Sequence, residues 1–426
     1  MIVPTRAPRR LAVVLALTLG ALAGGGSGVA AMPSASPAHP GSADPAKAAI
    51  IDDIVRRAMD DQHLRAAIVR VTIDGQDVLT KAYGASMTGV PATTDMQFRN
   101  GAVAIAYIAH VLLQLVDEGV VRLDDTVARY LPDLSHADEV TLGQLAQMTS
   151  GYPDYVLGNP DFPPRIYADP FRQWTPEELI GLVVDRPLLY PPGTAWNYAH
   201  TDYVILGLAL EAATGTPMEQ LIQERILDPW GLTRTSGNDG TPRIPDPALH
   251  AFTAERREFL GIPDGTPFIE DSTYWNPSWT LARGAIQTTD IRDLDATAIA
   301  IGTGRDLSPA AYQRMVSTEL RGRVAAVPGC PTCAPQDERY TFGMGVVLTG
   351  DWIAQTPLFA GQGGAFAYLP AERLAISVVT TFADDAFAPD GGLRPEVGGN
   401  AANVLWRTIA TAIVPPEEAP PPARGG

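Results

Sequence analysis

Short apolar runs with the character of β-strands lie near both ends of the chain. Residues 66–83 predict a β-hairpin, because two such runs flank the turn residues Asp74 and Gly75. Three further strands are predicted over residues 340–348, 359–368 and 374–382. Since the hairpin and these strands are far apart in the sequence, we expect them to meet in one discontinuous α/β body.

Helical spacing of apolar residues marks the two ends of this predicted body. Asp44 and Pro45 form a typical N-cap and first helical position, and apolar residues follow them at intervals of three and four. Near the other end, an amphipathic helix is predicted over about residues 400–413.

The middle of the chain is predicted to be mainly helical. Residues 101–118 predict a strongly apolar helix, and its polar residues His110 and Gln114 favour a buried core helix over a membrane span. Residues 141–280 alternate short helical patterns with loops rich in Pro and Gly. Two of these short helices are predicted over residues 175–184 and 203–213.

Composition and charge limit the possible partners. Hydrophobic residues make up 46% of the 426-residue chain, enough to bury a large core. The net charge of −17 and the pI of about 4.7 argue against nucleic acid and against anionic membrane surfaces, because both require a positive face. Only two lysines are present, Lys47 and Lys81, so any mechanism that needs a lysine must use one of them.

The first 31 residues have the pattern of a secretory signal peptide. Basic residues precede a 13-residue apolar segment, 11–23, and the small residues at 29–31 offer a cleavage site. An uncleaved membrane anchor is the alternative, but the apolar segment is short for a span. We therefore expect a secreted, extracytoplasmic protein without a stable membrane anchor. The pair Arg9-Arg10 leaves both the general secretory and the twin-arginine routes open.

Composition also suggests domain boundaries after the signal peptide. A disordered Pro/Ser/Ala linker is expected at one end of a single folded domain, and a disordered Pro-rich tail at the other. The predicted segments are 1–31 (signal peptide), 32–45 (linker), 46–413 (folded domain) and 414–426 (tail). Within the folded domain, the α/β part is expected at about 46–98 and 285–413, and the helical part at about 99–284.

The two cysteines, Cys330 and Cys333, form a C-x-x-C pattern in a Pro-rich segment. In an exported protein this pattern favours a small disulfide. A zinc site would need two more ligands, and the six histidines of the sequence show no ligand spacing. We expect no metal ion and no other cofactor.

Six segments, in order along the chain, carry a family resemblance. They are residues 98–133, 140–155, 188–215, 282–294, 340–348 and 359–382. Together they resemble the bacterial serine β-lactamase and DD-peptidase superfamily of penicillin-recognising proteins, and in particular class C-like β-lactamases, D-alanyl-D-alanine carboxypeptidases and related esterases. The resemblance implies an α/β fold of the β-lactamase/transpeptidase type, in which helices flank an antiparallel sheet and a mainly helical insertion is added.

The catalytic motifs of that superfamily are altered in this chain. The nucleophile and lysine of the family's Ser-x-x-Lys motif correspond here to Ala102 and Ile105. The family's Tyr-x-Asn motif keeps Tyr198 but has His200 in place of Asn, and Gln362 replaces the His or Lys that begins the third motif. No Ser-x-x-Lys occurs elsewhere in the sequence. These changes predict the loss of covalent serine catalysis.

The resemblance also implies that parts of the ligand-binding apparatus persist. The main-chain N–H groups of Ala102 and Ala365 correspond to the oxyanion hole of the family, and an alanine side chain does not remove a backbone donor. We expect these two residues, together with Gln362 and Gly364, to contribute to binding. For Gln362 the alternative is a purely structural role, in which its amide hydrogen-bonds to backbone groups at the strand end.

Tyr198 and His200 are the remaining candidates for catalysis. Tyr198 is the one retained residue of catalytic type, and His200 is a titratable side chain close to it in sequence. Alternatively, Tyr198 is a packing aromatic and His200 a solvated loop residue. Residues 152–167 and 273–279 are rich in aromatics and proline, and they either form the walls of a peptide or glycan cleft or pack in the core of their loops.

Three functional hypotheses follow from the sequence. The first is an exported family member without serine-hydrolase activity that binds a peptidoglycan-like peptide or another acyl ligand in the ancestral cleft. The second is a repurposed enzyme that uses Tyr198, His200 and the oxyanion-hole amides for non-covalent acid–base chemistry. The third is an active carboxypeptidase or esterase with a displaced nucleophile, which the missing lysine disfavours.

Overall fold

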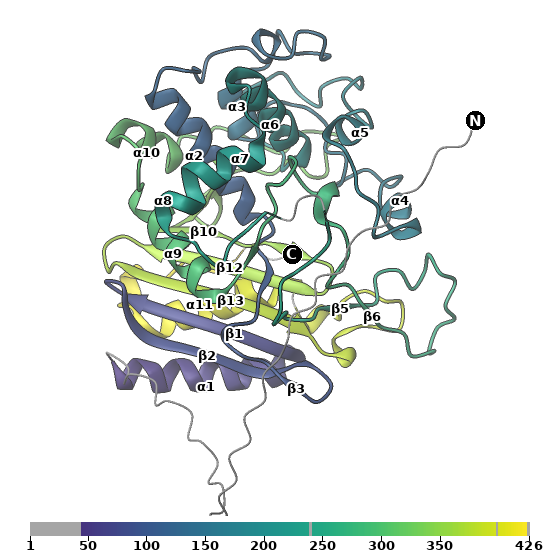
Figure 1. The fold of residues 1–426 in the computed structure, drawn as a ribbon, viewed down its shortest axis with the longest axis vertical. Helices are drawn as coiled ribbons and strands as arrows, with labels where there is room; N and C mark the ends of the chain where they lie inside the picture. The colour runs from purple at the N-terminus through teal and green to yellow at the C-terminus, as the bar shows by residue number, and fades with distance from the viewer. Residues whose placement is uncertain (1–43, 238–240, 398, 424–426) are drawn as a thin grey trace, which may run out of the picture. The chain divides into compact units, whose positions relative to one another are not determined.

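A nine-stranded antiparallel sheet forms the centre of the fold (Figure 1). The computed structural model describes residues 44–237, 241–397 and 399–423. Along the sheet the strand order is β3-β2-β1-β13-β12-β10-β9-β8, and β11 pairs with β12. The strands are β1 (Leu64–Ile73), β2 (Gln76–Met87), β3 (Val90–Pro91), β8 (Thr341–Phe342), β9 (Val347–Thr349), β10 (Trp352–Gln355), β11 (Leu358–Phe359), β12 (Gln362–Leu369) and β13 (Leu374–Phe382).

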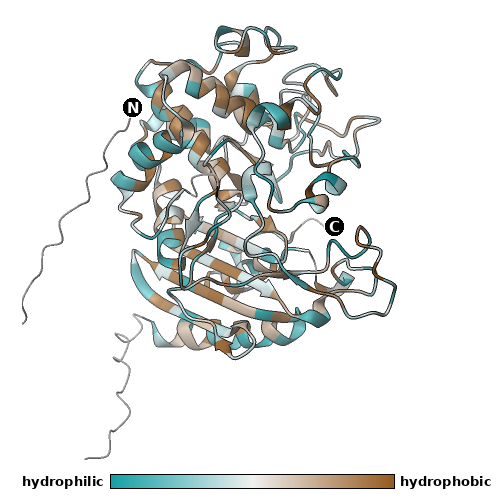
Figure 2. Cartoon of the chain, turned by 45° about the vertical axis from the view of Figure 1, so that its right-hand side comes forward, coloured by the Kyte–Doolittle hydropathy of each residue, from teal (hydrophilic) through white to brown (hydrophobic). Residues whose placement is uncertain are grey.

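The two ends of the chain meet in this sheet. The hairpin of β1 and β2 is joined to the C-terminal strands through the antiparallel pairing of β1 with β13, which places Val69 opposite Val378. Both strands are buried over most of their length, because helices cover both faces of the sheet. Figure 2 shows hydrophobic residues along the strands of the sheet, in keeping with this burial.

Helices α1 (Pro45–Asp61) and α11 (Ala401–Ile413) cover one face of the sheet. Ala365 and Ala367 of β12 belong to the core on this face, whereas Phe366 and Tyr368 belong to the core on the opposite face. This alternation is the normal consequence of strand geometry. The opposite face is covered by α2 (Val103–Asp117) and α9 (Ile291–Thr303).

The helical part lies beyond α2, between the strands of the main sheet in sequence. Its helices are α3 (Leu142–Ala146), α4 (Pro163–Ala168), α5 (Pro176–Ile180), α6 (His200–Thr214), α7 (Met218–Ile222), α8 (Asp228–Trp230) and, after α9, α10 (Pro309–Met315). Two small ladders lie outside the main sheet: β4 (Phe98–Arg99) with β7 (Thr288–Thr289), and β5 (Phe252–Thr253) with β6 (Glu270–Asp271). Helices α2 and α6 pack together at its centre.

The structure differs from the sequence prediction in two stretches of the α/β part. The strand predicted over residues 340–348 is two short strands, β8 and β9, because the chain turns at Gly345, which has a positive φ of 77°. The sequence prediction also contains no helix at α9, although Asp290 caps its first turn through both Arg292 and Asp293 N–H groups.

The predicted disordered tail is instead ordered as far as residue 423. The carbonyl of Glu418 accepts a hydrogen bond of 2.8 Å from the indole N–H of Trp352, and the carbonyl of Pro421 accepts one of 2.7 Å from Arg407. These donors are half-buried or buried, so the Pro-rich segment satisfies polar groups that would otherwise lack partners. The signal peptide and most of the linker fall within residues 1–43, outside the described residues. In the described ranges, no helix is both long and apolar enough to cross a membrane.

Candidate ligand cavity

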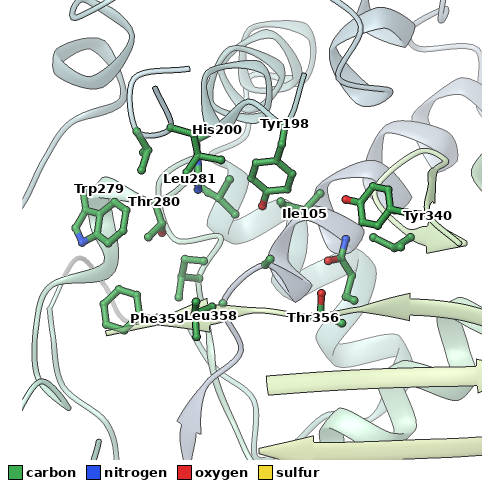
Figure 3. Close-up of a pocket in the computed structure, with 17 residues that line it drawn as sticks. Ile105, Tyr198, His200, Trp279, Thr280, Leu281, Tyr340, Thr356, Leu358 and Phe359 are labelled. Atoms are coloured by element: carbon green, nitrogen blue, oxygen red, sulfur yellow. The ribbon is translucent and has the colours of Figure 1, made fainter. Parts of the chain in front are cut away.

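A cavity of about 390 Å³ opens where the first turn of α2, the loop before α6 and the segment from β10 to β11 meet (Figure 3). Its walls combine aliphatic and aromatic side chains with a few uncharged polar ones. The lining residues are Gly101, Ala102, Ile105, Val156, Leu157, Tyr198, His200, Trp279, Thr280, Leu281, Ile286, Tyr340, Val347, Gln355, Thr356, Leu358 and Phe359. A largely apolar cavity with a few polar groups is typical of a small-molecule site.

Ala102 and Ile105 lie at this cavity, on the turn that begins α2. Ala102 is the N-cap of the helix, and Ile105 is completely buried at its start. The helix places both side chains on the same face, as the spacing of three residues requires. The two positions that the sequence resemblance assigned to the nucleophile and the lysine therefore line the cavity, and both carry hydrocarbon side chains.

Neither lysine of the chain reaches the cavity. The ammonium of Lys81 pairs with Asp52 of α1 at 2.5 Å. Lys47 itself belongs to α1, which covers the face of the sheet opposite to α2. Neither lysine therefore supplies a base at this cavity.

Tyr198 and His200 lie next to each other on the cavity wall. Their ring centroids are 5.2 Å apart and the rings meet edge to face, with the hydroxyl of Tyr198 directed into the cavity (Figure 3). Burial raises the pKa of the Tyr198 phenol well above its usual value, and nearby Tyr340 and Asp154 add to the rise. Tyr198 is therefore held as a neutral phenol and not as a phenolate base.

A buried carboxylate, Asp154, holds His200 in place. Its Oδ1 accepts the main-chain N–H of His200 at 2.9 Å, and its Oδ2 lies 3.0 Å from Nδ1 of the imidazole. Oδ2 also accepts the N–H of Leu157 at 2.8 Å. Since the carboxylate accepts these bonds, Nδ1 of His200 is its donor, and an imidazole with a single proton carries that proton on Nδ1 and has its lone pair on Nε2.

Asp154 is not marked by any motif in the sequence. It lies 46 positions before His200, within a segment that sequence reasoning marked only for its aromatic residues. No spacing rule links two residues at that separation, so only the fold reveals the pair. A family alignment showing an acidic residue at 154 whenever histidine occupies 200 could have signalled it.

Gln362, Gly364 and Ala365 do not line the cavity. The amide of Gln362 donates to the carbonyl of Arg99 at 2.7 Å, and the N–H of Gly364 donates to the carbonyl of Pro357 at 2.8 Å. Because successive N–H groups point to opposite edges of a strand, the N–H of Ala365 faces β13. The ligand-binding role expected for these three residues is corrected accordingly, and Gln362 has the structural role that was its alternative.

The disulfide between Cys330 and Cys333 supports the loop that carries Tyr198. A backbone bridge joins Cys333 to Asn197, directly before Tyr198. Both cysteines pack with Tyr190 and Ala195, which belong to the loop that carries Tyr198. Among the residues that the structure describes, no group of three or more potential metal ligands occurs.

The aromatic segments are divided between core and cavity. Tyr155 is fully buried, and its hydroxyl donates to the carbonyls of Trp279 and Thr280 at 3.0 Å. Trp279 in turn stacks on Phe359, with centroids 5.8 Å apart, and both of these rings line the cavity. The segments therefore supply one aromatic wall while most of their rings pack internally.

Comparisons with known proteins agree with this architecture. The family described as Beta-lactamase matches residues 51–395 of the chain. Penicillin-binding protein 4 of Amycolatopsis lactamdurans is 35% identical over 182 residues, which cover 40% of this chain and 44% of the relative. A putative D-alanyl-D-alanine carboxypeptidase of Escherichia coli K12 is 28% identical over 227 residues, which cover 47% of this chain and 50% of the relative. The chain thus matches about half the length of these curated relatives.

Solved structures show the same fold. A D-stereospecific amidohydrolase from a Streptomyces species superposes with a TM-score of 0.66 at 24% identity, covering 83% of this chain and 97% of that one. A penicillin-binding protein from Bacillus halodurans gives a TM-score of 0.66 at 14% identity, covering 84% of this chain and 100% of that one. The β-lactamase/transpeptidase-like fold expected from the sequence is confirmed, and the chain belongs to the Beta-lactamase family.

Proposed function

We propose that this protein binds an acyl or peptidoglycan-like peptide ligand in the cavity and forms no covalent acyl-enzyme. One observation carries the proposal: Ala102 and Ile105 line the cavity where the family's nucleophile and lysine would stand. Neither hydrocarbon side chain can attack a carbonyl or accept a proton. The cavity itself remains open to a ligand.

The size of the expected catalytic loss supports a binding role. In an unrelated serine hydrolase, removal of the nucleophile lowers turnover by roughly 10⁶, and the residual rate comes from binding and the oxyanion hole. One oxyanion-hole donor is available here, because the N–H of Ala102 makes no hydrogen bond within the described part of the chain. That donor can hold a ligand carbonyl without catalysing its hydrolysis.

Export is part of the proposal. The N-terminal pattern of basic residues, a short apolar segment and a small-residue cleavage site supports secretion. A location outside the cytoplasm would expose the cavity to cell-wall peptides and to compounds from outside the cell. The acidic composition favours a small-molecule or peptide ligand over nucleic acid as the partner.

Intact-mass spectrometry tests the proposal directly. The protein, from about residue 32, is incubated with a β-lactam and with an activated ester, next to an active serine β-lactamase as positive control. We expect no acyl adduct on this protein, because neither Ala102 nor Ile105 supplies a nucleophile or base. A stoichiometric adduct would show that another nucleophile operates and would overturn the proposal.

The Asp154–His200 pair favours a second candidate function, non-covalent acid–base catalysis. An imidazole oriented by a buried carboxylate and facing a cavity is suited to accept a proton from water or substrate. The neutral phenol of Tyr198 can only donate or accept a hydrogen bond beside it.

A hydrolysis assay separates the two functions. If catalysis occurs, His200→Phe should lower the hydrolysis rate of 4-nitrophenyl acetate by about 10²–10⁴-fold and remove its pH dependence. Tyr198→Phe should have a smaller effect, since it removes only a hydrogen bond. A rate equal to that of buffer, or one insensitive to both substitutions, would reject the catalytic function and leave binding as the remaining candidate.

A further inference from the structure

The walls of the cavity lack the four side chain types that are permanently charged near neutral pH. None of the lining residues is Lys, Arg, Asp or Glu. A carboxylate placed among Ile105, Leu281 and Ile286 would lose its hydration without gaining a Lys or Arg partner. The cavity is therefore poorly suited to anions, including the terminal carboxylate of a peptide.

The mouth of the cavity is also apolar. Leu157 is 43% exposed and Leu358 is 56% exposed, and both of them line the cavity. Exposed leucines are ordinary when isolated, but two that border one apolar cavity extend its hydrophobic surface to the solvent. The apolar part of a ligand can thus stay in contact with hydrocarbon from the entrance to Ile105.

One wall offers a hydrogen-bond acceptor with a fixed orientation. His200 lines the cavity, whereas Asp154, which engages its Nδ1, lies behind the wall and is completely shielded from solvent. The lone pair of Nε2 therefore faces the cavity, and none of the described residues donates to it. An acceptor on a cavity wall that no described residue engages is available to a ligand that brings a donor.

We propose that the ligand is an uncharged molecule whose apolar body fills the cavity and whose hydroxyl or amide N–H donates to Nε2 of His200. The inference rests on the proposed binding function and narrows it. Among the acyl ligands of the proposed function, neutral N-acyl amides fit this description, whereas peptides that end in a carboxylate do not. Apolar alcohols and phenols also fit it and extend the ligand class beyond acyl compounds.

Calorimetric titration with three matched aromatic probes and one peptide tests the inference. The probes are 2-naphthol, which is a neutral donor; 2-methoxynaphthalene, which lacks the donor; and 2-naphthoate, which is an anion. The peptide is N-acetyl-D-alanyl-D-alanine. We expect 2-naphthol to bind about tenfold more tightly than 2-methoxynaphthalene, and both anions to bind at least about a hundredfold more weakly than 2-naphthol.

Variants connect the preference to His200. His200→Phe should reduce the ratio of the two neutral affinities to about one, while His250→Phe, at a histidine that does not line the cavity, should preserve it. Asp154→Asn keeps the side-chain volume but no longer fixes the proton on Nδ1, so it should also reduce the ratio. This second variant covers the case in which the Phe substitution disturbs folding.

The outcomes distinguish the inference from the function on which it rests. Tightest binding of an anion would overturn the neutral ligand class and leave the binding function intact. An unchanged ratio in both the His200 and the Asp154 variants would overturn the role of Nε2. Binding of none of the four compounds would overturn the inference and the proposed binding function together.

Discussion

Gly345→Ala is expected to lower the free energy of unfolding by about 2–5 kcal/mol. Gly345 has a φ of 77°, a left-handed conformation that costs an alanine roughly 1–2 kcal/mol. A methyl group there would also lie 2.5 Å from the Cβ of Ala109 and 2.9 Å from the carbonyl oxygen of Ile105. Such overpacking typically costs about 1–3 kcal/mol more. Urea unfolding measures the sum.

A matched glycine separates the two costs. Gly89 has the same φ of 77°, but nothing lies within 4 Å of the position where its Cβ would be. Gly89→Ala should therefore cost only the conformational part, about 1–2 kcal/mol. Equal losses for the two variants would show that the contact of Gly345 with the start of α2 is not tightly packed. Because Ile105 lies in that contact, the Gly345 variant should also weaken binding of the naphthalene probes.

Asp295→Asn is expected to remove a large pH dependence from the stability of the protein. Asp295 lies in α9, with its side chain only 3% exposed against β1. Burial raises its pKa to about 7, and the opposing charge of Arg70 and the hydrogen bond from Thr72 offset this rise only in part. The folded state therefore holds this proton more tightly than the unfolded state, where the carboxyl has a pKa near 3.8.

The sign of the effect follows from proton linkage. A carboxyl with a raised folded-state pKa favours folding at low pH, and this contribution is lost as the pH rises from about 4 to about 7. Between pH 5 and pH 8, the unfolding free energy of the wild type should therefore fall by about 2–3 kcal/mol relative to the Asn variant. Other groups titrate in both proteins and cancel in this difference. A wild-type-to-variant difference that stays constant with pH would contradict the prediction.

Several elements of the fold could be predicted because local pattern and burial agree. Residues 101–118 are almost continuously apolar, and the structure makes Val103–Asp117 a helix that is buried on all sides except at its end. The hairpin turn at Asp74 and Gly75 was predictable because both residues adopt positive φ, which those residue types tolerate. Helix α9 was harder, since its charged residues Arg292, Asp293 and Asp295 interrupt the apolar spacing.

The candidate site was predictable only where a motif marks it. Ala102, Ile105, Tyr198 and His200 were found from their place in family motifs, and the structure brings all four to one cavity. Gln362 was found in the same way, but its amide is bound to a backbone carbonyl, a contact made by tertiary packing.

The sequence alone determined the family and the absence of a serine–lysine pair, because both depend on which residues are present and on their order. It also determined that the chain has no lysine after Lys81. Only the tertiary structure decided that Ala102 and Ile105 lie at a cavity wall, and that Asp154 orients His200 there. Those properties depend on contacts between residues far apart in the chain, and periodicity and spacing carry no information about such contacts.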